Sequence, residues 1–424
     1  NMDFSTFLLR FGFDPNNFEN NLSEPIQIFH GFIYEARQRT DVRICPFCGC
    51  KEAHIHGYYY TETRCNQNEH ITDILRIKRV RFKCTNCHKV YSPEIVGVDR
   101  RNKISLQVKA LMMNDFQRPI TFEDIGRKYG LSTAGVMKIF DRINFNVPRR
   151  ELPEVLCIDE IRFQSEKDIK YCCVLYDYFN RRIVDIIKSR QMAYLREYFS
   201  NIRENEREKV KIFISDMYDG YRTVKSLFFK HAIHIVDNFH VVTQLNRAVN
   251  SLRLRTMNGY TYKGDRLYNF MKSKWKYFLC RSEIIPNKYY VHASTGEINH
   301  YDDLVYDCIK LDYGFWDGYN CLQDLYHHPY SSNFDESLSM VLFLSNKLKS
   351  SNSDILKSVG NTYYKWRVEI ANAYTRDGKG ILYSNAIAEC INNKLKTIIK
   401  ISYGYRKFER FRKRALLICS YSLF

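Results

Sequence analysis

Three carboxylates occupy positions in the sequence that suit a site for divalent cations. Asp159 lies inside an apolar, strand-like run (VLCIDEIRF), Asp216 ends another (VKIFISD), and Glu389 lies on the polar face of a late basic helix (NAIAECINNKLKTIIK). A charge inside a central strand is costly unless it is paired or bound to a metal. Each hard cation needs several oxygen ligands from separate elements. A single acid of this kind is usually unremarkable, but the three together predict a site for two Mg²⁺ or Mn²⁺ ions.

Such a site has a definite chemistry. Two cations about 3.5–4 Å apart can activate a water or a 3′-hydroxyl and stabilise the leaving oxygen during in-line attack on a phosphodiester. No covalent protein intermediate or organic cofactor is needed. Polar residues near the ends of the same elements are expected to support the ligands, and Glu160 is expected on the opposite face of its strand. The expected supporting residues are Asp219, Asp237, His240 and Asn393.

Two cysteine pairs predict a structural zinc site. Cys45-x-x-Cys48 and Cys84-x-x-Cys87 are separated by 35 residues, and four thiolates form the closed tetrahedral shell that a structural Zn²⁺ prefers. The alternative is two pairs of buried thiols without a metal. Several nearby residues could replace one ligand, although a lone histidine is more often a surface residue: Cys50, Cys65, His54, His56, His70 and His88.

The segment TFEDIGRKYGLSTAGVMKIFDRI predicts a helix-turn-helix. Thr121 can cap the first helix with Asp124 completing a capping box, and Gly130 suits the left-handed end of that helix. Ser132 or Thr133 would cap the second helix. The residues expected to face the major groove of DNA are Thr133, Lys138 and Arg142. An ordinary helical hairpin is the alternative.

Charge points to a polyanionic partner. The formal net charge is +18, and residues 394–414 hold nine Lys or Arg against one Glu. Such density exceeds that of an ordinary solvated face and favours nucleic acid. The residues expected to contact DNA here are Lys396, Lys400, Arg406 and Arg410. The sequence shows no membrane-spanning run and no secretory leader, which predicts a cytoplasmic protein.

Hydrophobic patterning predicts an α/β protein of several domains. Residues 2–40 resemble a short helical lead-in, and residues 103–147 resemble three helices. From residue 154 onward, three strand-like runs are followed by alternating helices and strands, which is typical of a mixed sheet with helices on its faces. Residues 255–380 are rich in aromatic residues and lack strand alternation, so we expect a largely helical insertion.

The same residues carry a family resemblance. The pieces CPFCG, CTNC, IDEIRF, SDMYDGYR, IVDNFHVV and SNAIAECINNKLKTIIKISYGYRKFERFR resemble the Asp-Asp-Glu (DDE) transposases of bacterial insertion sequences, in particular the insertion-sequence L-three (ISL3) family. Cys390 departs from the glycine expected after the glutamate. The resemblance implies a ribonuclease-H-like core interrupted by the helical insertion, with Asp159, Asp216 and Glu389 as its catalytic triad.

The resemblance also implies the activity and the partners. We expect recognition of terminal inverted repeats, Mg²⁺-dependent strand cleavage and transfer, and a homodimer or higher oligomer on paired DNA ends in the bacterial cytoplasm, associated with the nucleoid. The expected domains are a lead-in (1–41), a zinc finger (42–98), a helix-turn-helix (99–150), a catalytic core (151–254 with 381–424) and the insertion (255–380).

Two other interpretations remain open at this stage. The chain could be a zinc-finger and helix-turn-helix regulator, or an inactive transposase relative that still binds repeats. Intact acids argue against simple decay. One tryptophan of the insertion could stack on DNA ends, although core packing is the commoner role for each of Trp275, Trp316 and Trp366.

Overall fold

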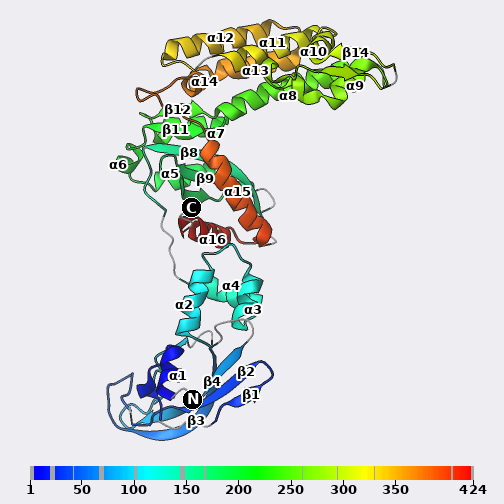
Figure 1. The fold of residues 1–424 in the computed structure, drawn as a ribbon. Helices are drawn as coiled ribbons and strands as arrows, with labels where there is room; N and C mark the ends of the chain where they lie inside the picture. The colour runs from blue at the N-terminus through cyan, green and yellow to red at the C-terminus, as the bar shows by residue number, and fades with distance from the viewer. Residues whose placement is uncertain are drawn as a thin grey trace. The chain divides into compact units, whose positions relative to one another are not determined.

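The protein divides into two compact units. The computed structural model describes residues 4–19, 24–41, 43–65, 71–99, 103–143, 149–166, 169–259, 261–293, 295–328, 330–402 and 404–421. Unit 1 comprises residues 1–148 together with 395–424, and unit 2 comprises residues 149–394 (Figure 1). Among the described residues, no helix combines the length and hydrophobicity needed to cross a lipid bilayer.

The N-terminal part of unit 1 is a seven-stranded sheet built on a long antiparallel hairpin, β3–β4. The strand order is β1-β2-β4-β3-β7-β6, with β5 beside β4. Leu75 and Ile77 pack in one core with Phe7 and Leu8 of α1, whereas Val80 and Phe82 pack beside the cysteines. The elements are α1 (Phe4–Arg10), β1 (Ile26–Ile28), β2 (Gly31–Arg37), β3 (Ala53–Arg64), β4 (Thr72–Cys84), β5 (Val90–Tyr91), β6 (Val98–Asp99) and β7 (Ile104–Ser105).

The prediction of a helical lead-in is wrong for its second half. Within residues 4–19 and 24–41, which the structure describes, α1 and a short 3₁₀ turn at Pro15–Asn17 are the helical parts, whereas β1 and β2 are strands. β2 pairs parallel with β4 over seven positions, from Gly31 opposite Thr72 to Arg37 opposite Lys78. This pairing is formed with residues about forty positions later in the chain, so local patterning gave little sign of it.

The rest of unit 1 is helical. The three helices expected over 103–147 are α2 (Leu106–Asp115), α3 (Phe122–Tyr129) and α4 (Thr133–Arg142), while residues 144–148 lie outside the described part of the chain. Phe116, Phe122 and Phe140 form their common core, with edge-to-face and tilted ring contacts. Leu417 of α16 (Phe408–Tyr421) is buried in the same core. The last described helix therefore packs on the helix-turn-helix.

Unit 2 contains a five-stranded mixed sheet of order β10-β9-β8-β11-β12. The first three strands are antiparallel, and β11 and β12 lie parallel to β8. The sheet is therefore mixed, as the sequence predicted. Leu156 and Ile158 of β8 pack on one face against α5 and α7. The elements are β8 (Val155–Glu166), β9 (Ile169–Asp177), β10 (Arg182–Ile187), α5 (Met192–Ser200), α6 (Glu204–Arg207), β11 (Ile212–Ser215), α7 (Asp219–Phe228) and β12 (Ile233–Val236).

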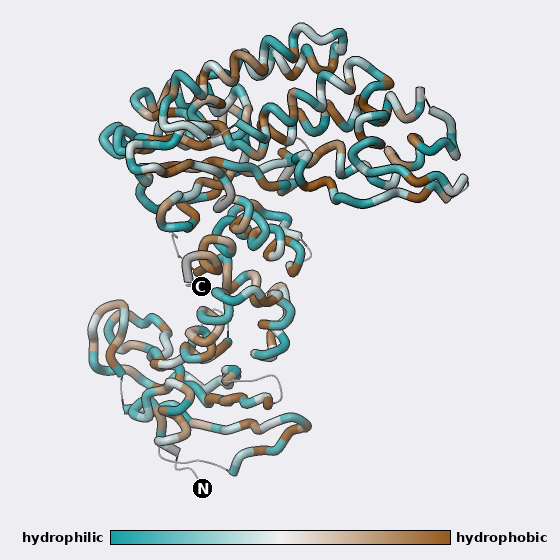
Figure 2. Tube along the Cα trace, turned by 45° about the horizontal axis from the view of Figure 1, so that its top comes forward, coloured by the Kyte–Doolittle hydropathy of each residue, from teal (hydrophilic) through white to brown (hydrophobic). Residues whose placement is uncertain are grey.

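A largely helical segment follows the sheet, as expected for residues 255–380. Figure 2 shows hydrophobic and hydrophilic stretches alternating along its helices, which is the pattern of helices that pack on one side. A small hairpin, β13–β14, is its only described sheet. The elements are α8 (Asn238–Gly259), α9 (Arg266–Ser273), β13 (Tyr289–Val291), β14 (Ile298–His300), α10 (Tyr301–Ile309), α11 (Tyr313–His327), α12 (Phe334–Ser350), α13 (Asp354–Lys365) and α14 (Arg367–Tyr374). The chain then enters α15 (Ala386–Ile401).

Candidate active site

Asp159 lies on the sheet face opposite α5 and α7. Its Oδ1 accepts a hydrogen bond from the backbone N–H of Glu160 (2.7 Å), and its Oδ2 accepts one from Nδ2 of Asn392 on α15 (2.7 Å). Burial raises the pKa of Asp159, while the Glu160 N–H and the charge of His240 act in the opposite direction. The carboxylate is thus oriented by two donors, although each oxygen keeps a further lone pair for another ligand.

Asp216 follows directly after β11, the strand that pairs parallel with β8. Its Oδ1 is buried and has no hydrogen-bond partner. Burial, together with the negative charges of Glu160 and Asp159, raises the pKa of Asp216 to about 6, although His240 lowers it. A buried carboxylate oxygen without a donor is expensive, and a cation would satisfy it. The donor set therefore fits a divalent metal.

Glu389 lies in the first turn of α15, and its side chain is exposed. The helix is anchored on both sides of it. The backbone N–H of Asn385 donates to Oδ1 of Asp237 (3.2 Å), and Asn392 contacts Asp159. Residues 385, 389 and 392 share one helix face because they are four and three positions apart. Glu389 therefore lies between two contacts. One ties the start of α15 to Asp237, after β12, and the other ties α15 to Asp159 on β8.

The expected supporting residues have different surroundings. Asp237 follows directly after β12 and is buried, and its Oδ2 lies 3.8 Å from Nε2 of His240. Asp219 instead makes an ion pair with Lys365 of α13 (2.6 Å). Asn393 is exposed. As expected from strand alternation, Glu160 lies on the other face, where Arg190 and Tyr221 both donate to it (2.9 Å each).

Asn392 is the polar contact that the sequence analysis missed. The sequence analysis predicts this role for the exposed neighbour Asn393, which has the same side-chain chemistry. A signal was available, because Asn392 lies in the apolar stripe that includes Ala388, Ile391 and Leu395. A polar side chain within an apolar stripe is buried and needs hydrogen-bond partners.

The four cysteines form a compact cluster at one end of the N-terminal sheet. Their sulfur atoms all lie within 4.8 Å of one another, and the Sγ distances Cys45–Cys87 and Cys48–Cys84 are 3.5 Å. A tetrahedron with Zn–S bonds of about 2.3 Å has sulfur separations of similar size, so the cluster fits one zinc ion. The backbone N–H of Cys50, together with the neighbouring thiols, lowers the pKa of Cys48 to about 6, whereas burial and the neighbouring thiols raise the pKa of Cys84 to about 12. Cys48 is thus the more readily ionised thiol of this pair.

The other candidate zinc ligands lie outside this cluster, and His70 lies outside the described residues. Within the described part of the chain, these cysteines are the one group in which three or more His, Cys, Asp or Glu ligand atoms come within 4.8 Å of one another. The carboxylate oxygens of Asp159, Asp216 and Glu389 therefore do not all lie within 4.8 Å of one another. A pair of cations about 3.5–4 Å apart spans a wider ligand set than one ion does.

The helix-turn-helix has the local features that the sequence predicted. Thr121 and Asp124 form a reciprocal capping box, Gly130 has φ of 63°, and Ser132 caps α4. Lys138 and Arg142 are exposed on α4, and Thr133 is half-buried in its first turn. The amphipathic pattern thus leaves a polar face on the second helix, as DNA contact would require.

The cations of the C-terminal segment divide into two groups. Lys396, Lys400 and Arg406 are exposed. Arg410 instead makes a two-pronged ion pair with Asp141 of α4, through Nε (2.9 Å) and Nη2 (2.6 Å). Lys413 donates to the carbonyl oxygens of Phe140 and Ile143 at the end of α4. Arg410 and Lys413 thus hold α16 against the helix-turn-helix.

The tryptophans of the insertion differ in exposure. Trp366 is buried, and the guanidinium of Arg222 lies 3.8 Å from its ring centre. Trp316 is half-buried against Tyr306. Trp275 is 42% exposed. Of the three, Trp275 is the one whose exposure suits contact with a ligand.

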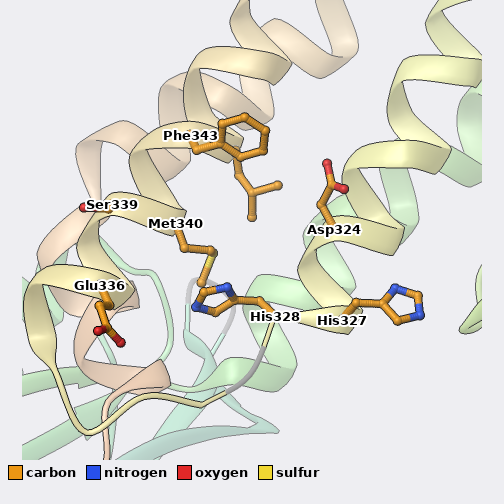
Figure 3. A pocket seen from close by; sticks show the side chains of 8 residues that line it. Asp324, His327, His328, Glu336, Ser339, Met340 and Phe343 are labelled. Atoms are coloured by element: carbon orange, nitrogen blue, oxygen red, sulfur yellow. The ribbon is translucent and has the colours of Figure 1, made fainter.

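A pocket of about 440 Å³ opens on the insertion between α11 and α12 (Figure 3). In this view His328 lies beside Met340, whereas His327 points away and pairs with Glu283. The lining residues are Asp324, His327, His328, Glu336, Ser339, Met340, Phe343 and Leu344. None belongs to the strands or the helix that bear the three carboxylates, so this pocket is separate from the candidate active site.

Comparison with known families identifies the class of protein. Residues 156–415, more than half of the chain, match a transposase family, so the protein is a transposase, an enzyme class that cuts and joins DNA. The matching family is that of the ISL3-type DDE transposases, and the chain belongs to it. A search among curated proteins finds no match.

Proposed function

We propose that this transposase binds the terminal inverted repeats of an insertion sequence, cleaves them and joins them to target DNA. Asp159, Asp216 and Glu389 would hold the two divalent cations of the reaction. The observation that carries the proposal is the pair of aspartates on neighbouring parallel strands, of which Asp216 has a buried oxygen without a donor. The strand order β10-β9-β8-β11-β12 supports a ribonuclease-H-like core within unit 2, to which the first part of α15 brings Glu389. The end of the expected core, residues 395–424, belongs to unit 1 instead.

The roles of the protein groups follow from their positions. Bound cations would supply Lewis-acid activation of the attacking and leaving oxygens. Asp159 is held by two hydrogen-bond donors, so it can present its remaining lone pairs in a fixed direction. His240, which lies beside Asp237, lowers the pKa of both Asp159 and Asp216 and so favours the ionised, ligand-competent forms.

DNA binding is assigned to unit 1 and α15. The exposed side chains of Lys138 and Arg142, with Thr133, would contact the inverted repeat through the major groove. Lys396, Lys400 and Arg406 would contact phosphates. Arg410 is the weakest member of the predicted set, because its guanidinium already pairs with Asp141. Pairing of two DNA ends would require a homodimer or a higher oligomer.

Zinc has a structural role in this proposal. The four thiolates leave no open coordination position, which is typical of structural rather than catalytic sites. The cysteines hold the end of the β3–β4 hairpin, since Cys84 is the last residue of β4 and pairs with Ala53 of β3.

The decisive experiment uses DNA that carries the inverted repeats flanking the source gene. Wild-type protein and Asp159→Ala would be incubated with this DNA, in Mg²⁺ or in chelator. We expect Mg²⁺-dependent nicking at the repeat tip in wild type, a loss of at least ~10³-fold in the variant, and unchanged repeat binding. Equal nicking by the variant would exclude Asp159 from the active site.

A regulator or inactive relative predicts a different result. Tight repeat binding without cleavage in Mg²⁺ or Mn²⁺ would support it, and the three acids would then be structural. The buried, unpartnered oxygen of Asp216 favours the enzyme, because a purely structural carboxylate in that position would be expected to have a donor.

A further inference from the structure

Asn392 joins α15 to two strands of the catalytic sheet. The residue is 4% exposed. Its Nδ2 donates to Oδ2 of Asp159 on β8 (2.7 Å), and its Oδ1 accepts from the hydroxyl of Tyr176 on β9. Tyr176 is itself fully buried, and it lies opposite Cys157 of β8 in the sheet. A three-residue hydrogen-bond chain therefore runs from β9 through the helix to β8.

The chemistry of the groups fixes the direction of this chain. An ionised carboxylate only accepts hydrogen bonds, so the amide edge facing Asp159 must be the NH₂ group. The amide oxygen then faces Tyr176, whose hydroxyl must donate. Reversing the amide would place two acceptors against each other at Asp159, in a buried setting where an unsatisfied polar atom is costly. The carboxylate of Asp159 thus fixes the orientation of the Asn392 amide, and the hydroxyl of Tyr176 anchors the opposite edge of that amide to β9.

The same bond sets the position of Glu389. Asn392 lies three residues after Glu389, on the same face of α15. A rotation or shift of α15 that moved Glu389 away from the strands would break the bond between Asn392 and Asp159. One side chain therefore sets both the orientation of the first carboxylate and the rotation of the helix that carries the third.

We propose that Asn392 is a positioning residue for cation binding, held in place by Tyr176. This inference rests on the proposed function, since it takes Asp159 as a metal ligand. Partners that orient metal ligands typically contribute about 10- to 100-fold to metal affinity. Asn392 touches neither DNA nor cation in this assignment and acts through Asp159.

The test is a Mn²⁺ titration of the full chain followed by electron paramagnetic resonance, which reports binding without any DNA or turnover. Asn392→Leu keeps the branched shape of the side chain, with a somewhat larger volume, and removes both hydrogen bonds. We expect it to weaken Mn²⁺ binding about 10-fold. Tyr176→Phe removes only the hydroxyl and keeps the ring, so we expect a smaller weakening in the same direction. It also covers the case in which Asn392→Leu does not fold.

Two controls separate the possible outcomes. Cys390→Ala alters an exposed residue of the same helix and should leave the titration unchanged. Asp159→Ala should abolish binding at this site. If Asp159→Ala binds Mn²⁺ as wild type does, the proposed metal site is wrong. If Asp159→Ala loses binding while folded Asn392→Leu and Tyr176→Phe retain wild-type affinity, the metal site stands and the role of Asn392 is refuted.

Discussion

Arg414 is the largest of the fully buried side chains, with 1% exposure among the described residues. Its Nη2 donates to the carbonyl oxygens of Arg118 and Ile120 (2.9 Å each). Its guanidinium also lies over the rings of Phe122 and Phe116, at 5.0 and 5.5 Å. Burial lowers the pKa of Arg414 to about 10, so the group stays charged at neutral pH. Carbonyl and aromatic contacts thus replace part of the water that this cation loses, while its buried Nη1 has no hydrogen-bond partner.

Arg414→Ala should therefore destabilise unit 1 strongly. The change leaves a cavity and two carbonyl oxygens without their donor, and we expect a loss of about 3 kcal/mol in the free energy of unfolding. Chemical denaturation of the variant and of Glu409→Ala, an exposed residue of the same helix, would measure it. Equal loss in both variants would contradict a specific role for Arg414.

His234 predicts a dependence of stability on pH. Burial, with smaller contributions from Arg222 and Lys225, lowers the pKa of His234 to about 3. The unfolded chain, with a histidine pKa of about 6.5, binds this proton more readily. Stability from this residue is therefore full above pH ~6.5 and declines as the pH falls toward 3. Between pH 6.5 and 5 the loss is about 2 kcal/mol.

The measurement compares wild type with His234→Gln by chemical denaturation at pH 6.5 and pH 5. The variant cannot titrate at this position, so its stability should change less over that interval than the wild type's. Identical pH dependences would show that His234 gains or loses its proton equally in both states. Limiting the interval to pH 5 and above avoids most carboxylate titration.

At this scale, much of the candidate site follows from the sequence. Asp159 and Asp216 could be chosen because each lies in or directly after an apolar strand, where a charge is costly unless it is paired or bound to a metal. Asn392 and Tyr176 could not be paired, because they are far apart in the chain and each resembles ordinary core or helix sequence. Their relation depends on the packing of α15 on the sheet.

Among the elements, the β3–β4 hairpin is the one that the proposed zinc site would stabilise. Cys45 and Cys48 precede β3, while Cys84 and Cys87 lie at the end of β4. The small core beside them is formed by few apolar residues, among them Ala53 and Phe82. Closing a chain segment of this length with a metal contributes folding free energy directly.

Removal of zinc should therefore unfold this end of the sheet. We expect about one equivalent of zinc in purified protein, and loss of strand signal in circular dichroism after treatment with a strong chelator. Cys48→Ser should bind less than half an equivalent, whereas Cys50→Ser should bind as wild type does. A metal-free protein with an unchanged spectrum would contradict a structural zinc site.

Elements with local signals were predicted best. The capping box at Thr121 and the left-handed Gly130 mark the ends of α3 in the sequence itself. β1 and β2 carry no comparable signal, because parallel pairing with β4 is needed to stabilise them. Because this pairing is long-range, the local pattern of residues 2–40 predicts helix where β1 and β2 are strands.

At the scale of the whole molecule, unit 1 is assembled from two distant parts of the chain. Residues 1–148 and 395–424 belong to it, and the intervening chain forms unit 2. The core of the helix-turn-helix includes Leu417 of α16, and Lys413 of α16 donates a hydrogen bond to the carbonyl oxygen of Phe140 near the end of α4. The boundary after residue 150 that the sequence predicted for the helix-turn-helix thus omits α16, which packs in its core.

A chain that ends at Lys407 should therefore lose repeat binding, even though the helix-turn-helix sequence is intact. Loss of α16 exposes Phe116, Phe122 and Phe140, so we expect weaker binding by at least ~10-fold in a gel-shift assay. Asp159→Ala serves as the control for binding without cleavage. Full binding by the shortened chain would show that α2, α3 and α4 suffice.

The position of α16 also has a consequence for synthesis on the ribosome. More than 260 residues separate the end of α4 from Phe408. At about 5–20 residues per second, tens of seconds pass between the synthesis of α2, α3 and α4 and the synthesis of α16, which completes their core. DNA recognition would therefore mature only after α16 has been translated, so a polypeptide interrupted before that helix would be a poor competitor for the same DNA ends.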